Sequence, residues 1–210
     1  MDYPPEPWHL KGQLLMSIWA VPSAAALGAG DPPPGTRPVI LGRRCLTACV
    51  WLRYEHGGVL EYDEVLNAVL VRRGRRVMVW IPHIWVDSPV SRDGGRELWG
   101  LPKQLAVFDP HDGDRYGATQ QSDGSGIASA RLGRLIRLPG RWPISYDVVQ
   151  SMDGAAKVSP VRFKGRVELL RGRWTFAPDG PLPHLARRRA LLSIGLRDFD
   201  LVFGSPGVAA

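Results

Sequence analysis

The chain has 210 residues, a net charge of +7 and 44% hydrophobic residues, with a mean hydropathy of -0.12. These values are typical of a globular protein, and the chain is long enough to bury a core without metals or disulfides. They argue against a membrane protein, since no apolar run reaches the roughly 18 residues that a span needs. We expect a single domain over residues 1–210.

The positive charge is spread along the chain, with arginines in several short groups and only four lysines. A nucleic-acid-binding protein usually concentrates its Lys and Arg on one helix or stripe, so we expect a solvated basic surface and neither a nucleic-acid nor a membrane partner. The first residues lack a basic segment followed by an apolar one, and Cys45 and Cys49 are the only cysteines. Both features favour a cytoplasmic protein without a disulfide framework.

Short apolar runs, broken by 24 glycines and 19 prolines, predict a mainly β protein with many turns. In chain order the expected strands are residues 13–21, 39–42, 46–55, 65–72, 76–85, 104–108, 118–122, 127–135, 161–169, 174–176 and 199–203. Hairpin turns are expected at residues 73–74 and 123–126.

Two helices are predicted. The first covers residues 88–98, where Ser88 can cap the helix and Pro89 suits its first turn. The second covers residues 183–194 and ends at Gly195, a residue typical of the position after a helix.

The segment SRDGGRELWGLPKQLA, residues 91–106, holds the most informative residue of the chain, Lys103. Its neighbours include Trp99, Leu101 and Leu105. Burial of a lysine disfavours its charged form, and a neutral amine can attack a ketone to give a Schiff base. We therefore expect desolvation to lower the pKa of Lys103 far enough to make it a nucleophile. The alternative is a surface lysine whose stem lies along apolar neighbours.

The string GRELWGLPKQLA resembles the signature of the acetoacetate decarboxylase family, in which Gly-Arg-Glu is followed by Pro-Lys-Lys-Leu. Two further blocks agree with the family in order and spacing. These are PPEPWHLKGQLLMSIWAVP near the N-terminus, and GGVLEYDEVLNAVLV, residues 57–71, with its Tyr-x-Glu at Tyr62 and Glu64. The resemblance covers about half of the chain, from Pro4 to Phe108.

The resemblance implies that Lys103 is the Schiff-base lysine and that Glu64 is the active-site carboxylate. It also implies a mainly antiparallel, cone-shaped β-barrel or double sheet with a few peripheral helices, a homo-oligomer, and a lyase that decarboxylates a small or medium β-keto acid without a cofactor. We expect Tyr62, Trp99 and Leu101 to contact the substrate.

Two positions depart from the family pattern. Gln104 stands where the family has a second lysine, and Gln13 aligns with an arginine suited to a substrate carboxylate; both are candidate substrate-binding residues. The departures leave open a related imine chemistry, namely aldol, dehydration or cyclisation. A noncatalytic barrel that binds an apolar ligand is a further alternative.

The remaining conspicuous residues are interpreted as structural. Arg96 and Glu97 are expected to form an ion pair that holds the turn between helix and strand. Neither the histidines nor Cys45 and Cys49 have the spacing of a metal site, and no nucleotide-binding fingerprint occurs. We therefore expect no metal and no nucleotide.

Overall fold

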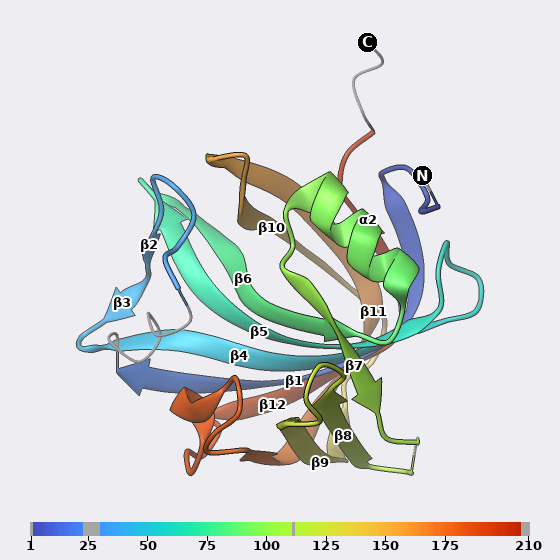
Figure 1. The fold of residues 1–210 in the computed structure, drawn as a ribbon. Helices are drawn as coiled ribbons and strands as arrows, with labels where there is room; N and C mark the ends of the chain where they lie inside the picture. The colour runs from blue at the N-terminus through green and yellow to red at the C-terminus, as the bar shows by residue number, and fades with distance from the viewer. Residues whose placement is uncertain (1, 23–29, 111, 207–210) are drawn as a thin grey trace.

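A computed structural model describes residues 2–22, 30–110 and 112–206 of the chain. Its strands form one 12-stranded sheet that curves strongly around the molecule (Figure 1). The longer strands are β1 (Trp8–Pro22), β4 (Arg44–Glu55), β5 (Tyr62–Arg73), β6 (Arg76–Val86), β9 (Gly126–Arg137), β10 (Trp142–Met152), β11 (Ala155–Phe176) and β12 (Leu192–Phe203). The shorter ones are β2 (Arg37–Pro38), β3 (Ile40–Leu41), β7 (Lys103–Phe108) and β8 (Arg115–Gln120).

The strand pairings close on themselves. Strands β6, β5, β4, β1, β12, β11 and β10 pair in that order, and β10 returns to β6 through the pair Val148 and Val79. Strands β7, β8 and β9 form a second path from β6 to β11. Nearly all pairings are antiparallel, while β6–β7 and β10–β6 are parallel. The mainly antiparallel β fold expected from the sequence is therefore confirmed.

Strands β1, β4 and β5 lie between two apolar layers, so both of their faces are largely buried. Successive strand residues point to opposite faces. On β4, Val50, Leu52 and Tyr54 belong to one hydrophobic cluster, whereas Cys49 and Trp51 belong to the other. The cluster that contains Cys49 and Trp51 is a packed core, while the cluster that contains Val50, Leu52 and Tyr54 surrounds a cavity.

Helix α2 (Pro89–Trp99) connects β6 to β7 and contacts β6, β7 and β11. It lies across one end of the curved sheet, directly before β7 (Figure 1). Ser88 caps its N-terminus by accepting a hydrogen bond from the Ser91 backbone N–H, and Gly100 ends it with a left-handed φ of 65°. The sequence prediction of this helix is confirmed.

The second predicted helix is wrong. Residues 183–194 contain only a 3-10 turn, η2 (Pro183–Leu185), followed by the start of β12. Gly195, the expected helix end, pairs with Leu15 of β1 and Glu168 of β11. Here the pairing of β12 between two long strands overrides the local helix propensity.

The strand assignments need three corrections. The predicted run 39–42 contains only the two-residue strand β3, and β2 lies just before it. The runs 161–169 and 174–176 form parts of one strand, β11, because Gly172 stays paired with Leu132 of β9. Strand β10 was not predicted, since its first four residues are exposed and include Pro143. Proline is tolerated in a strand where no neighbouring strand needs a hydrogen bond from its N–H. Pro143 meets this condition toward β6, because β10 pairs with β6 only at Val148. Both predicted hairpins are present.

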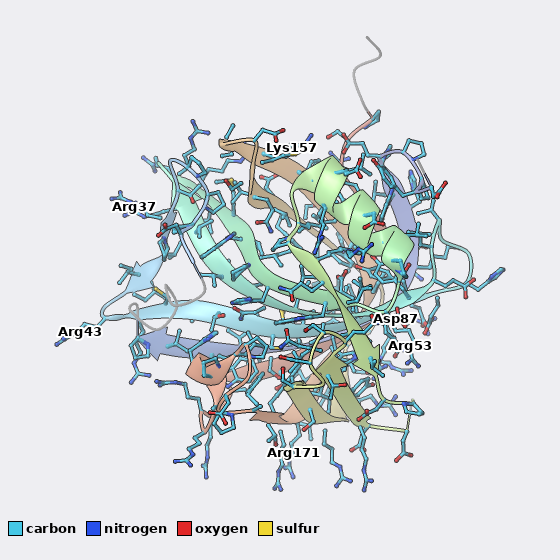
Figure 2. The ribbon with its side chains drawn as sticks, in the orientation of Figure 1. Arg37, Arg43, Arg53, Asp87, Lys157 and Arg171 are labelled. Atoms are coloured by element: carbon cyan, nitrogen blue, oxygen red, sulfur yellow. The ribbon has the colours of Figure 1, made fainter. Side chains whose placement is uncertain are left out.

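The arginines point outward on several sides, as Figure 2 shows for Arg37, Arg43 and Arg171. Cys45 and Cys49 are buried and unpaired. No helix among the described parts of the chain is long and apolar enough to cross a membrane.

Candidate active site

A cavity of about 470 Å³ lies inside the ring of seven strands. Most of its lining is aliphatic or aromatic. Its polar lining residues are Thr47, Tyr54, Tyr62, Glu64, Lys103, Ser145 and Tyr146. Lys103 and Glu64, which the family resemblance assigns to one active site, thus share an apolar cavity.

The topology brings Lys103 and Glu64 together from neighbouring parts of the sheet. Strand β6 lies between β5 and β7, with Val86 opposite Glu64 on one side and Ile84 opposite Lys103 on the other. Lys103 is the first residue of β7, directly after Pro102 and the end of α2. Both side chains point into the ring from strands that are two apart.

The ammonium group of Lys103 is almost completely enclosed, with 3% of the side chain exposed. Its Nζ donates hydrogen bonds to Glu64 Oε2 at 2.9 Å, Ser91 Oγ at 2.9 Å and the Tyr62 hydroxyl at 3.3 Å. It also lies 4.9 Å from the centre of the Tyr62 ring. These contacts hold the amine in one place without exposing it to water.

The carboxylate of Glu64 is equally buried, with 4% of its side chain exposed. Its second oxygen, Oε1, accepts a hydrogen bond from the Tyr54 hydroxyl at 3.3 Å. A buried carboxylate is stable when it is paired and hydrogen-bonded. Lys103 and Tyr54 supply those partners here.

The pKa of Lys103 differs from the sequence expectation. Burial alone would lower it, but the negative charge of Glu64, together with Tyr62, outweighs burial and raises the pKa above its ordinary value. The expectation that desolvation dominates was therefore wrong, because it left out a carboxylate at 2.9 Å. The resting amine is an ammonium ion, and Glu64 is the nearest group that can accept its proton.

Three tyrosines surround the pair and remain protonated. Burial raises the pKa of Tyr62 to about 12. Burial and the charge of Glu64 also raise the pKa values of Tyr54 and Tyr146 above the ordinary value for a phenol. Their hydroxyls are thus hydrogen-bond donors near the end of the cavity that holds Lys103 and Glu64.

Helix α2 contributes residues that sequence reasoning missed. Ser91 is fully buried and accepts a hydrogen bond from Lys103. A Cβ at Gly95 would lie 2.7 Å from Lys103 Cδ, and one at Gly94 would lie 2.6 Å from the Trp8 ring. Two adjacent glycines inside a helix cost stability, so the pair in the sequence was a signal that something packs closely against the helix.

Arg96 and Glu97 do not form the expected ion pair. Arg96 Nε donates instead to the backbone carbonyl of Lys103 at 2.7 Å, while Glu97 accepts from the Tyr3 hydroxyl at 2.7 Å. Consecutive helix residues point in different directions, which separates the two side chains. Arg96 still stabilises the turn from helix to strand, but through the backbone of Lys103.

Two predicted substrate contacts, Trp99 and Leu101, line the cavity beside Tyr62. Trp99 packs edge-on against Trp8, with ring centres 4.8 Å apart, and its Nε1 donates to Glu6 Oε2 at 2.7 Å. The N-terminal segment therefore closes the cavity next to the lysine.

Gln13 and Gln104 lie outside the cavity, which corrects the expectation that they contact a substrate there. Gln13 faces the opposite side of β1, where it donates to Glu55 and accepts from Arg197. Gln104 is exposed and borders an outer groove. Because strand residues alternate, the residue after Lys103 cannot share its face.

The other lysines are more accessible than Lys103. Lys11 and Lys164 are exposed on β1 and β11, and Lys157 has 39% of its side chain exposed. Over the described ranges, no group of three His, Cys, Asp or Glu residues is arranged to hold a metal.

Comparison with known proteins supports the resemblance seen in the sequence. The profile described as acetoacetate decarboxylase (ADC) matches residues 38–159, which is more than half of the chain. No curated protein sequence matches.

Several solved structures are similar in fold. An acetoacetate decarboxylase from Legionella pneumophila has a TM-score of 0.70 at 17% identity, over 100% of this chain and 90% of that one. The enduracididine biosynthesis enzyme MppR, complexed with pyruvate, has a TM-score of 0.68 at 18% identity, over 97% and 90%. An acetoacetate decarboxylase-like enzyme from Sphingomonas wittichii has a TM-score of 0.62 at 14% identity, over 96% and 92%.

Proposed function

The chain belongs to the acetoacetate decarboxylase family, and on that premise we propose that it is a lyase that decarboxylates a β-keto acid through an imine with Lys103. The observation that carries the proposal is the buried amine of Lys103, held 2.9 Å from the carboxylate of Glu64 at one end of an apolar cavity. An enclosed amine next to a proton acceptor is the arrangement that Schiff-base formation requires.

The reaction begins with transfer of a proton from the Lys103 ammonium to Glu64. The free amine then attacks the keto carbon, and loss of water gives a protonated imine. The bond between the α-carbon and the carboxylate breaks, its electron pair moves toward the imine nitrogen, and CO2 leaves an enamine. Because the proton that Glu64 took from Lys103 leaves with the expelled water, Glu64 takes up a second proton from solvent and delivers it to the enamine carbon. Water then hydrolyses the imine, which releases the ketone and regenerates the Lys103 ammonium.

The tyrosine hydroxyls have a separate role in this proposal. Tyr62, Tyr54 and Tyr146 are protonated donors around the buried pair. Donors that are fixed before the reaction stabilise charge without reorganisation. They would hold the substrate carboxylate before it leaves as CO2.

A second candidate function is aldol, dehydration or cyclisation chemistry through the same imine. It is favoured by the charges of the cavity, since Lys103 is the only Lys or Arg among the described residues that line it. An arginine would bind a carboxylate more strongly than hydroxyls do. The similar enzyme MppR is also known as a complex with the condensation product of pyruvate and imidazole 4-carboxaldehyde.

One experiment tests the shared imine and separates the two reactions. The protein is incubated with a panel of β-keto acids at pH 7, with and without borohydride, and intact mass and CO2 release are measured against an enzyme-free blank. We expect one reduced adduct on Lys103, together with CO2 release, and we expect neither with Lys103→Ala or Lys103→Arg. Trapping without CO2 supports the second candidate. Labelling of all four lysines alike, or no labelling, contradicts both.

The family resemblance further suggests a homo-oligomer, and the two unpaired cysteines are consistent with a reducing, cytoplasmic location.

A further inference from the structure

We infer that the substrate of the proposed reaction is a 3-oxo acid of roughly 8–14 carbons in total, whose keto group lies at Lys103 and whose alkyl chain extends along the cavity. The inference rests on the proposed function and names its substrate class. It is carried by the length, the apolar character and the one-sided opening of the cavity.

The lining runs along three adjacent strands, β1, β4 and β5, and on β1 it extends from Leu10 to Ile18. The cavity-facing residues of β5 extend from Tyr62 to Leu70, and those of β4 from Leu46 to Tyr54. Eight residues of strand span about 26 Å at a rise of about 3.3 Å per residue. A substrate as small as acetoacetate would occupy only the end that holds Lys103.

Burial defines the two ends of the cavity. At one end, Glu64 and Lys103 are 3% and 2% exposed when the whole residue is counted. At the other end, Ile18, Leu46 and Leu70 are only partly buried, and Ile144 is 36% exposed. The reacting group therefore lies at the closed end. Whatever is attached to it must extend toward the open end, past aliphatic side chains.

The volume fits an alkyl chain of medium length. A dry apolar cavity of about 150 Å³ accommodates one benzene ring. At about 470 Å³, this cavity has room for on the order of three times as many atoms, which exceeds a four-carbon keto acid and agrees with a chain of the proposed length.

A pair of small residues widens the middle of this path. Ala48 and Ala68 lie directly opposite each other on β4 and β5, and both line the cavity. The cavity-facing residues on either side of them are larger, namely Leu46, Val50, Leu66 and Leu70. Ala68 is four residues from Glu64, about 13 Å along the strand, which corresponds to about ten bonds of an extended chain at ~1.2 Å per bond.

The first test is a chain-length series of 3-oxo acids from 3-oxobutanoate to 3-oxotetradecanoate, with CO2 release measured below the micelle concentration and corrected for the uncatalysed rate. Each buried methylene contributes about 0.8 kcal/mol, or about a fourfold change. We expect kcat/KM to rise at least a hundredfold between 3-oxobutanoate and 3-oxodecanoate and then to level off. A flat series, or a maximum at 3-oxobutanoate, overturns the inference while the imine chemistry stands.

The second test blocks the path. Ala68→Phe places a ring across the middle of the cavity, so the ratio of kcat/KM for 3-oxododecanoate to that for 3-oxobutanoate should fall at least tenfold. The matched control is Ala155→Phe, at an exposed position at the start of β11, which should leave the ratio unchanged. An unchanged ratio in Ala68→Phe contradicts the proposed position of the chain.

The third test measures binding of the chain without the reaction. In the double variant Glu64→Gln/Lys103→Met, both members of the buried pair are replaced, so neither charge is left unpaired. Calorimetric titration with 2-undecanone should show binding at least a hundredfold tighter than with 2-butanone, and a negative heat-capacity change. Equal affinities overturn the inference. Tight binding here without CO2 release by the unmodified protein refutes the decarboxylation and retains the alkyl site.

Discussion

At the scale of single residues, the charge of Glu64 stabilises the buried ammonium of Lys103 and thereby disfavours the neutral amine that the proposed reaction needs. The same carboxylate that stabilises a buried ammonium raises the pKa of that ammonium. In the proposed reaction, the amine becomes nucleophilic only after its proton has moved to Glu64, 2.9 Å away. On this proposal, activation of the lysine depends on proton transfer within the pair rather than on burial alone.

Glu64→Gln separates these two effects. Without the carboxylate, burial is the largest remaining influence and favours the neutral amine, so the pKa of Lys103 should fall below its ordinary value. The pH profile of borohydride trapping should therefore shift toward lower pH in the variant. Steady-state CO2 release should fall by about 10²–10⁴-fold, the contribution of a positioned acid or base.

The matched control for that experiment is Glu61→Gln, a change of an exposed carboxylate three residues earlier in the chain. We expect it to leave both the trapping profile and CO2 release unchanged. A trapping profile in Glu64→Gln that stays in place, or moves toward higher pH, would show that Glu64 does not control the protonation of Lys103.

Gly95→Ala tests the close packing of α2 against the lysine. The added Cβ would lie 2.7 Å from Lys103 Cδ and 2.8 Å from its Cε, so the flexible side chain must move. Alanine also favours the helix by about 1 kcal/mol over glycine. We expect kcat to fall at least tenfold while the melting temperature changes little.

Asp93→Ala on the same helix is the control, because the Asp93 carboxylate accepts a hydrogen bond from Arg92 and does not line the cavity. It should leave kcat within about twofold of the unmodified protein. Full activity in Gly95→Ala would mean that the position of the Lys103 stem is not critical.

At the scale of elements, Glu168 joins three strands. It lies on β11 with 1% of its side chain exposed, within 3.6 Å of Arg134, 3.0 Å of Arg137 and 3.1 Å of Arg197. Burial would raise the pKa of Glu168, but hydrogen bonds from Arg197 and Arg137 outweigh it and lower the pKa. The ionised carboxylate of Glu168 therefore stabilises the folded protein at any pH above the pKa that this group has in the unfolded chain. This stabilisation is lost as the pH falls through the lower pKa that the group has in the folded protein.

Glu168→Gln should destabilise the fold, because it leaves three arginines around an uncharged side chain. We expect the free energy of unfolding to fall by about 1–3 kcal/mol at pH 7, the scale of hydrogen bonds to charged groups. Urea unfolding at pH 7 and at pH 3 measures the loss, and the difference between the proteins should shrink at pH 3. A difference that grows on acidification would contradict this assignment.

Local signals explain which elements were predictable. Helix α2 was found because Ser88 and Pro89 mark its start, and the structure adds Gly100 as the residue that ends it. Strand β12 was missed in part because its identity depends on pairing with β1, which is about 180 residues earlier in the chain. Residues 183–191, just before β12, do not alternate between polar and apolar side chains as a strand does. Only the pairing with distant strands therefore shows where β12 begins.

The candidate site was predictable to a similar degree. Lys103 and Glu64 came from motif resemblance, and their contact then required β6 to lie between β5 and β7, which no local pattern specifies. Ser91 and the roles of Gly94 and Gly95 were missed because their partners are distant in the sequence. Gln13 was misplaced because its face depends on the register of β1, which shifts between Gly12 and Leu14. Gln104 was misplaced because it directly follows Lys103 on β7 and strand residues alternate between faces.

At the scale of the whole molecule, the short strand β3 forms an exposed edge of the sheet. Strand β3 pairs only with β4 among the described strands, and its two residues, Ile40 and Leu41, are 55% and 59% exposed. Exposed apolar residues on an edge strand favour pairing with another chain. Together with the oligomers that the family resemblance implies, this exposed edge favours self-association.

We therefore expect light scattering to give at least twice the chain mass of 23.2 kDa at micromolar concentration. The double variant Ile40→Lys/Leu41→Lys should shift the measured mass toward the monomer, because two charges on the edge strand oppose its burial against a second chain. Leu191→Lys is the matched control, since Leu191 is 66% exposed but lies outside the strands, and it should leave the mass unchanged. A monomer mass for the unmodified protein would refute self-association. An oligomer that persists in the double variant would place the interface elsewhere than at β3.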